Sequence, residues 1–414
     1  MVQSLLGLAT LLAVAMLLSE RRGTIPWRLA LGGLTLQAAI AAFMLKAPFL
    51  RGIFLALNAL VGAMDAATRA GTAFVFGYVG GGPAPFEVTT PSASFILGFQ
   101  ALPLVIVIAA LTALLYYWKI LPRVVRAFSL VLEKSMGIGG VLGVGAGGCV
   151  FLGMIEAPLL IRPYMERMTR SELFAMMATG MSCIAGTMLM LYATVLQHVI
   201  PDALGHILTA SVIHAPAALV VAALMIPETE APTLGHKLPG SPASGAMDAV
   251  VSGTSDGLRL FWNIVATLLV FIALVKLANI LLGTLPDVAG APLTLERMLG
   301  VVMAPVAWLL GVPWAEATTA GSLLGTKIVL NEFIAFIDMA KLPGTALSEH
   351  SRLILTYAMC SFANLGSVGI LLAGMGSLCP TRKKEITALG GRALVAGVLA
   401  SLMTGTVVGI LASF

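Results

Sequence analysis

The chain has 414 residues, of which 59% are hydrophobic and only 10% are charged. This composition excludes a soluble globular protein, because many apolar runs are long enough to cross a bilayer core of about 30 Å. The net charge of +5 is modest and lies in short loops, where basic residues set membrane orientation and do not indicate a nucleic-acid partner. We predict an all-α polytopic protein surrounded by membrane lipid.

Residues 1–136 are predicted to hold scaffold helices and interfacial helices. Val2–Leu18 is a first span, and no cleavage signal marks it as a signal peptide. The basic residues that follow, up to Arg28, place this loop in the cytoplasm and the N-terminus outside. The next elements are an outward span (Trp27–Phe49), an interfacial amphipathic helix (Arg51–Arg69), a loop (Gly80–Pro91) and an inward span (Ser92–Trp118).

Residues 137–226 are predicted to form the first half of a transport unit. Gly137–Met168 is apolar, interrupted at Gly147-Gly148 and at Gly153, and followed and preceded by basic residues. We therefore expect a re-entrant hairpin that enters from the cytoplasm. An outward span (Ser171–Val199) with small and polar residues at its centre and an inward span (Ile207–Ile226) follow. Residues 227–256, rich in Pro, Gly and Ser, are predicted to be a polar linker.

Residues 257–414 are predicted to repeat this plan in inverted orientation. The expected elements are an outward span (Leu258–Leu282), an amphipathic segment (Leu293–Leu299), a second hairpin (Val302–Leu342), a broken inward span (Leu347–Leu378) and an outward span (Ala388–Ala412). The chain thus has about eight transmembrane helices, two re-entrant hairpins and interfacial helices. Paired broken segments in inverted halves indicate the substrate site of a transporter, and ordinary Gly/Ser helix packing is the alternative.

Two glutamates, Glu156 and Glu332, occupy matching places in the two hairpins. An ionised carboxylate inside a membrane is costly unless it faces water, a partner or a ligand. We predict that the hairpins meet near the membrane midplane and face the breaks at Ile184–Thr187 and Phe362–Ser367. The alternative is a pair of structural charges satisfied by Lys327 and backbone amides.

Three stretches of the chain resemble the concentrative nucleoside transporter family. They are Gly153 with Glu156–Leu159, Gly325–Lys327 through Asn331–Phe333, and Phe362–Asn364 with Ser367. The similarity runs from about Ser92 to the C-terminus. It implies a homotrimer in a bacterial inner membrane, with outer scaffold helices and a mobile, elevator-like transport domain. It also implies a secondary active nucleoside symporter, not an enzyme, with a proton or sodium ion as its coupling ion and no cofactor.

The resemblance assigns a role to the second hairpin and the helix after it. In the family, the hairpin Glu and a Phe-x-Asn-x-x-Ser motif hold the ribose, and the corresponding residues here are Glu332, Phe362, Asn364 and Ser367. A carboxylate and an amide can accept from and donate to neighbouring hydroxyl groups, and such a site rejects analogues that lack them.

The first hairpin departs from the family pattern. The family's Gln and Ser/Thr, which bond the base edge, are replaced by Met154 and Ile155. Glu156 remains and is available to a base directly or through water. Met188, next to the first break, is also included in the predicted substrate-binding set. The base preference is therefore open.

The coupling-ion region departs as well. The family's two side-chain sodium ligands correspond to Cys149 and Cys183, near Ile184 and Glu156. Sodium prefers oxygen ligands, and a thiol is a poor substitute. We expect the cysteines to be neighbours without sodium between them, and transport to be driven by protons. Because burial favours the neutral form of a carboxyl group, Glu156 is the candidate proton carrier, with Glu332 as the alternative.

Two other functions stay open at this point. The chain is either a member respecialised to another ribose-bearing solute, or a transport-incompetent sensor on a transporter scaffold. An intramembrane enzyme is not expected, because the sequence has no H-E-x-x-H motif and no nucleophile elbow. No metal site is predicted, since the four cysteines make no C-x-x-C pair.

Overall fold

The computed structural model describes residues 2–46, 48–87, 95–196, 199–233, 243–288 and 290–413. These residues are helical or irregular apart from one isolated bridge between Val288 and Ala291, so the all-α prediction is confirmed. The N-terminal part contains α1 (Val2–Leu17), α2 (Trp27–Lys46), α3 (Pro48–Phe76), η1 (Gly77–Gly80), α4 (Leu97–Gln100), α5 (Leu104–Tyr117) and α6 (Ile120–Met136).

The remaining helices follow one order twice, with a hairpin, a broken helix and a long helix in each half. The first half contains α7 (Gly140–Phe151), α8 (Glu156–Ile161), η3 (Arg162–Tyr164), α9 (Arg170–Ser182), α10 (Gly186–Leu196) and α11 (Ala203–Met225). After α12 (Ala246–Leu282), the second half contains α13 (Leu295–Leu310), α14 (Trp314–Val329), α15 (Glu332–Lys341), α16 (Glu349–Met359), α17 (Leu365–Leu378), η4 (Pro380–Arg382) and α18 (Lys383–Ala412).

Five helical segments among the described residues are long and apolar enough to cross a membrane, so the chain is a multi-pass membrane protein. They are Trp27–Lys46, Leu97–Tyr117, Ala203–Met225, Ala246–Leu282 and Pro380–Ala412. A sixth would be the pair α13 and α14, which is bent by 115°. The expected count of about eight included α1, which has 16 residues, and the two broken helices, so this count stays a prediction.

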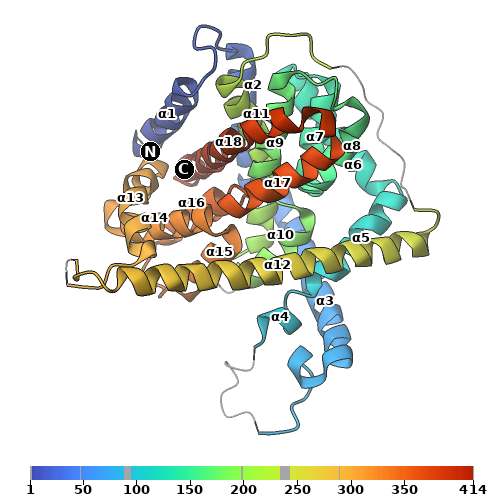
Figure 1. The fold of residues 1–414 in the computed structure, drawn as a ribbon, viewed down its shortest axis with the longest axis vertical. Helices are drawn as coiled ribbons and strands as arrows, with labels where there is room; N and C mark the ends of the chain where they lie inside the picture. Colours follow the sequence, from blue (N-terminus) through green and yellow to red (C-terminus); the bar gives the residue numbers. More distant parts are fainter. Residues whose placement is uncertain are drawn as a thin grey trace.

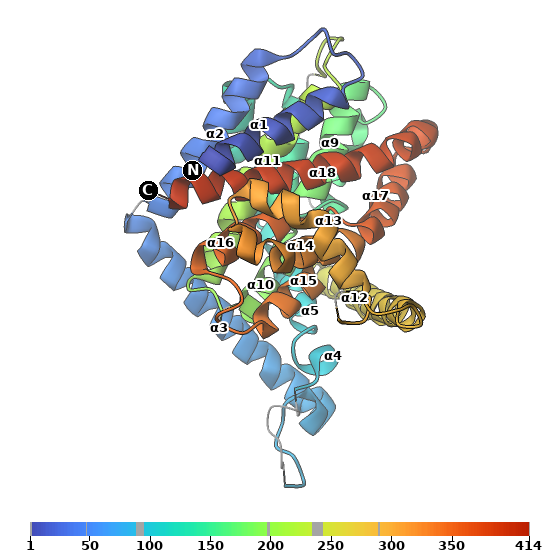
Figure 2. The ribbon, with the colours of Figure 1, turned by 90° about the vertical axis from the view of Figure 1, so that its left-hand side faces the viewer.

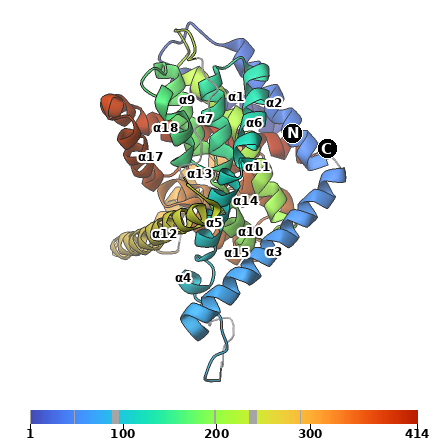
Figure 3. The same ribbon diagram turned by 90° about the vertical axis from the view of Figure 1, so that its right-hand side faces the viewer.

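Helices α11 and α18 form the centre of the molecule. In the most apolar stretch of each helix, 89% of the α11 residues and 72% of the α18 residues are buried, compared with 6% of the α12 residues. Figures 1 and 2 show α18 crossing the molecule beside α9 and α11, with the two chain ends close together. Helices α1 and α2 pack against α11 and α18, and α12 packs mainly against α5 at the edge. Figure 3 shows α3 running from the body toward α4.

One expectation for the first half is wrong in detail, and one helix before it was not assigned. The expected interruption at Gly147-Gly148 does not occur, because α7 continues to Phe151. A Cβ at Gly147 would lie 3.1 Å from the Val125 carbonyl oxygen, so this glycine allows α6 to approach and does not break the helix. The basic segment after Trp118, to which the sequence assigned no particular element, forms α6, whose buried residues recur every three or four positions.

Three boundaries in the rest of the chain also differ. Helix α12 begins at Ala246, inside the expected linker of residues 227–256, and Asp248 accepts hydrogen bonds from the Ser244 amide (2.8 Å) and hydroxyl (3.0 Å) near this start. Helix α13 is continuous from Leu295 to Leu310, so the second hairpin consists of α14 and α15 only. The span expected over Ser92–Trp118 is seen as Leu97–Tyr117, with a turn at residues 101–103 between α4 and α5, and residues 88–94 lie outside the described residues. The division into four domains stays a prediction.

A cluster of charges joins the loop after α1 to two of the central helices. The Glu20 carboxylate pairs with Arg170 at the start of α9 (2.9 Å) and with Arg392 of α18. Arg170 also faces Glu385 at 3.5 Å. The hydrogen bond from Arg170 lowers the pKa of Glu20 below its ordinary value of 4.5. The charged form of Glu20 is therefore the one that stabilises the folded protein.

We predict that Glu20→Gln lowers the thermal stability of the purified protein at pH 7 by about 1 kcal/mol or less, since the pairs are partly exposed. The contribution of Glu20 is fully present above pH 4.5 and is lost as the pH falls through its lowered pKa. The difference in melting temperature between wild type and variant should therefore shrink on acidification. Asp65→Asn, which removes an exposed pair within α3, serves as the control. A difference that stays constant down to pH 3 would contradict this assignment.

Candidate functional site

The tip of the first hairpin packs against the break between α9 and α10. Gly153, in the turn before α8, has a φ of +100°, a backbone conformation that favours glycine. A Cβ at this position would also lie 2.7 Å from the Cβ of Ala185 in the break. The sequence Gly153 to Glu156 therefore forms a tight turn in direct contact with the first broken helix, as the sequence predicts.

One hydroxyl group of α11 joins these two segments. The Ser211 hydroxyl lies 3.0 Å from the carbonyl oxygen of Val150 and 3.3 Å from that of Ile184. Both carbonyls are at points where a helix ends, so they lack regular intrahelical partners. Ser211 is fully buried. The hairpin and the break are thus held together by a protein hydroxyl.

The second hairpin and the second break are organised by asparagines. Asn331 precedes α15, and its side-chain oxygen accepts a hydrogen bond from the Ile334 amide (2.9 Å). Asn364 precedes α17, and its side-chain oxygen accepts from the Ser367 amide (2.8 Å). Asparagine is among the preferred residues for capping the N-terminus of a helix. These caps fix where the two helices begin beside the cavity.

Glu332 is the first residue of α15, and its carboxylate is bonded on both oxygens. The Tyr192 hydroxyl of α10 donates to one oxygen (2.5 Å), and the Asn364 side-chain amide donates to the other (3.0 Å). Glu332 is 4% exposed. Lys327 of α14, also buried, interacts with it electrostatically and donates to the Ala363 carbonyl oxygen (3.0 Å). The second hairpin, the second break and α10 therefore meet at this carboxylate.

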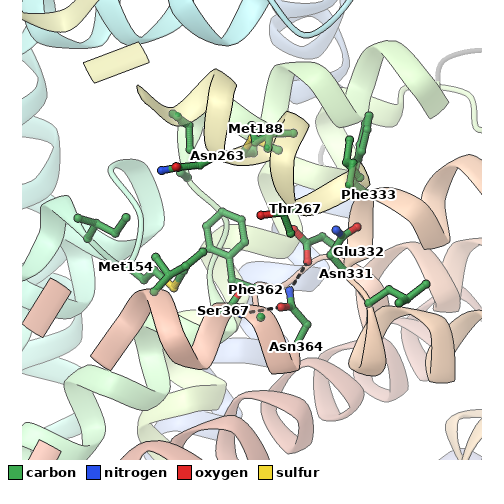
Figure 4. A pocket seen from close by; sticks show the side chains of 18 of the residues that line it. Met154, Met188, Asn263, Thr267, Asn331, Glu332, Phe333, Phe362, Asn364 and Ser367 are labelled. Atoms are coloured by element: carbon green, nitrogen blue, oxygen red, sulfur yellow. Dashed lines mark hydrogen bonds between the residues drawn. The ribbon is translucent and has the colours of Figure 1, made fainter. Parts of the chain in front are cut away.

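These elements enclose a cavity of about 340 Å³. Figure 4 shows Glu332, Asn364 and Ser367 around the Phe362 ring, with Met154 on the other side of the ring. All eight residues of the predicted substrate-binding set line this cavity: Met154, Ile155, Glu156, Met188, Glu332, Phe362, Asn364 and Ser367. The structure thus brings them into one place.

The two glutamates are held differently. Glu156, the first residue of α8, is exposed toward the cavity, and its carboxylate makes no hydrogen bond or ion pair with another side chain in the described ranges. The alternative of two structural charges fits Glu332 in part, because Lys327 is close to it. For Glu156 no such cation is close in the part of the chain that the structure describes, and its carboxylate interacts with its own backbone amide.

Two residues of the predicted coupling-ion region, Cys149 and Cys183, also lie close together. Cys149 and Cys183 are fully buried free thiols, close enough to interact electrostatically. The Cys183 thiol lies 3.8 Å from the Ser211 carbonyl oxygen. Both therefore face packed protein and not the cavity.

Several cavity residues were not anticipated from the sequence. Tyr192 of α10 belongs to an element that was predicted, but no local pattern indicated that it faces the site. Asn331 stands in a stretch that resembles the family, but it was assigned no part in the site. Asn263, Thr267 and Phe271 come from α12, which was assigned no part in the site. Their spacing of four residues on one helix face was the only available signal.

Comparison with known proteins finds nucleoside transporter sequences matching most of the chain. Family models match in three places: the N-terminus of Na+ dependent nucleoside transporters at residues 6–79, a nucleoside-recognition (Gate) model at 98–198, and the C-terminus of the same transporters at 206–409. The chain is 37% identical to YutK, an uncharacterised transporter of Bacillus subtilis, over 98% of both proteins. It is 32% identical to the nucleoside permease NupC of Helicobacter pylori, over 98% of this chain and 97% of that protein.

The chain belongs to the concentrative nucleoside transporter family. Its fold matches that of CNTnw in an inward-facing substrate-bound state with a TM-score of 0.91 and 34% identity, over 100% of this chain and 98% of that one. An outward-facing variant of CNTnw matches over the same shares, with a TM-score of 0.92 and 35% identity. The family and structural relatives are transporters and not enzymes, and the resemblance described from the sequence is confirmed.

We predict that Gly153→Ala destabilises the transporter by at least about 1–2 kcal/mol, because of its positive φ and the contact with Ala185. Two matched variants separate these causes. Gly137 also has a positive φ (+68°) but open space around it, and Gly391, inside α18, has open space and an ordinary φ. The loss of melting temperature should decrease in the order Gly153→Ala, Gly137→Ala, Gly391→Ala. Equal effects at Gly153 and Gly137 would show that the contact with Ala185 contributes nothing.

Proposed function

We propose that this protein imports nucleosides across a bacterial inner membrane by proton symport. The observation that carries the proposal is the Glu332 carboxylate, which lies in the cavity and is oriented by Tyr192 and Asn364. Membership of a nucleoside transporter family supports the substrate class. A secondary transporter of this kind needs a site between its two halves, and the cavity lies where the hairpins meet.

The ribose end of the substrate would bind at Glu332. Each carboxylate oxygen already accepts one hydrogen bond and keeps a second lone pair for a sugar hydroxyl. The Ser367 hydroxyl lies in the same part of the cavity, and Phe362 supplies an apolar ring surface. Because both oxygens are held in fixed directions, two neighbouring hydroxyl groups would be recognised together.

The base end would lie toward the first hairpin. Met154, Ile155 and Met188 offer apolar contacts there, and Glu156 offers an acceptor without another side-chain partner. The replacement of a polar pair by Met154 and Ile155 is the observation that keeps open a second candidate, a transporter of another ribose-bearing solute. A transport-incompetent sensor on the same scaffold is the third.

The coupling ion is proposed to be a proton. Thiols at Cys149 and Cys183 are poor sodium ligands, and the nearby carbonyl oxygens of Val150 and Ile184 face the Ser211 hydroxyl. This donor set does not suit sodium. Glu156 is the proposed proton carrier, because its carboxylate faces the cavity at the tip of the hairpin. Glu332 is the alternative.

The proposed assembly is a homotrimer with its N-terminus outside. The long apolar face of α12 is exposed, which fits contact with lipid or with another copy of the chain. The hairpins and broken helices would form the mobile part of each copy.

We predict that Glu332→Gln and Asn364→Ala each weaken nucleoside binding to the purified protein by roughly tenfold or more, because each leaves a buried polar partner unpaired. Titration calorimetry with uridine and adenosine measures this. Glu349→Gln is a matched control, since Glu349 is also the first residue of a helix, α16, but is exposed. Wild-type affinity in both site variants would remove the ribose assignment.

We predict that proteoliposomes take up nucleoside in sodium-free buffer and that an inward proton gradient stimulates the rate. Glu156→Gln should abolish this stimulation while uptake down a nucleoside gradient continues. The double variant Cys149→Asn/Cys183→Ser restores oxygen ligands and should gain sodium stimulation. Sodium-dependent uptake by the wild type with a flat pH profile would contradict proton coupling. Binding without any uptake would favour the sensor.

A further inference from the structure

One face of α12 forms a wall of the cavity. Its lining residues are Leu260, Asn263, Ile264, Thr267, Leu268 and Phe271, which recur at the three- and four-residue spacing of a single helix face. Two of them, Asn263 and Thr267, are polar and four positions apart, so their side chains are neighbours. Only 6% of the residues in the most apolar stretch of this helix are buried, and its exposed side chains include Leu269, Val270 and Ile272. A polar pair on such a helix needs an explanation.

The polar groups of this pair have no partners in the described part of the chain. Asn263 is exposed and makes no hydrogen bond there. The Thr267 hydroxyl is likewise unbonded, whereas Thr254 of the same helix donates to the Val250 carbonyl oxygen (2.8 Å). A helical threonine that does not bond back to its own helix has its hydroxyl available to a ligand. Both groups line the cavity.

Among the described residues that line the cavity, Asn263 is the asparagine whose side-chain oxygen and side-chain NH2 group are both without a hydrogen bond. The cavity has two other asparagines among the described residues, Asn331 and Asn364, and each uses its side-chain oxygen as a helix cap. Figure 4 shows Asn263 and Met154 on one side of the Phe362 ring, with Glu332 and Asn331 on the other. Asn263 therefore lies away from the proposed ribose end, on the side of the apolar Met154 side chain of the first hairpin.

We propose that Asn263, with Thr267 beside it, recognises the hydrogen-bonding edge of the nucleobase. A carboxamide presents a donor and an acceptor side by side, the arrangement that pairs with an adjacent acceptor and donor on a base. In this assignment, α12 supplies a carboxamide for base recognition in addition to the acceptor that Glu156 offers on the first hairpin. The ligand class is a nucleoside whose base carries an exocyclic amino or oxo group next to a ring nitrogen. This inference rests on the proposed nucleoside-binding function.

The test is a double comparison of ligand and protein. Purified wild-type protein and Asn263→Leu are titrated with cytidine, with the matching pyrimidine riboside that lacks the 4-amino group, and with adenosine and its analogue that lacks the 6-amino group. The wild type should bind at least one parent nucleoside roughly tenfold more tightly than its analogue, the discrimination of about one hydrogen bond. In Asn263→Leu this ratio should fall to about one. Thr267→Val should reduce the same ratio by a smaller factor.

Two controls distinguish this inference from the proposed function. Thr254→Val changes a polar residue of α12 outside the cavity and should keep the wild-type ratio. Glu332→Gln should weaken parent and analogue by the same factor, because it acts on the ribose. If Asn263→Leu weakens parent and analogue equally, or leaves both unchanged, the base-reading role is overturned while nucleoside binding stands. If the wild type binds none of the four ligands, the proposed function fails and this inference fails with it.

Discussion

A carboxylate buried among helices inside a membrane must be satisfied by its neighbours, and in this protein that requirement falls on Glu332. Its partners come from three different elements: Tyr192 from α10, Asn364 from the start of α17, and Lys327 from α14 through a charge interaction. Moving any one element away would leave a buried polar group unpaired. The tip of the second hairpin is therefore fixed relative to both broken helices by a single side chain.

The two halves of the chain reach similar shapes by different chemistry. In the first half, the hairpin tip is held by the close contact of Gly153 with Ala185 and by the Ser211 hydroxyl. In the second, Asn331 and Asn364 cap the helices, and their side chains face the cavity. One end of the cavity is consequently lined largely by the apolar side chains of Met154, Ile155 and Met188, with Glu156 among them, and the other is polar. Such a cavity suits a ligand with a flat, largely apolar end and a hydroxyl-bearing end.

The sequence predicted those parts of the fold and the site that depend on local signals. Glycine, asparagine and the isolated glutamates marked both hairpin tips and both breaks, because helix breakers, caps and intramembrane charges act where they stand. Helix α6 and the start of α12 were missed, since basic or Pro/Gly/Ser-rich composition outweighed their helical pattern. Tyr192 and Asn263 were missed for another reason: only the packing of separate helices brings them to the cavity.

The position of α12 gives the two ends of the site different mechanical roles. Helix α12 packs mainly against α5 at the edge of the molecule, whereas the contacts of Glu332 in α15 come from α10, α14 and the start of α17. Ribose contacts would therefore stay together if the hairpins moved as one body, while a base contact from Asn263 would be made in one position and lost in another. A ligand shifts a conformational equilibrium only through different affinities for its states. If the proposed assignments hold, the ribose would determine whether a nucleoside binds, and the base would determine how strongly binding favours one position of the hairpins.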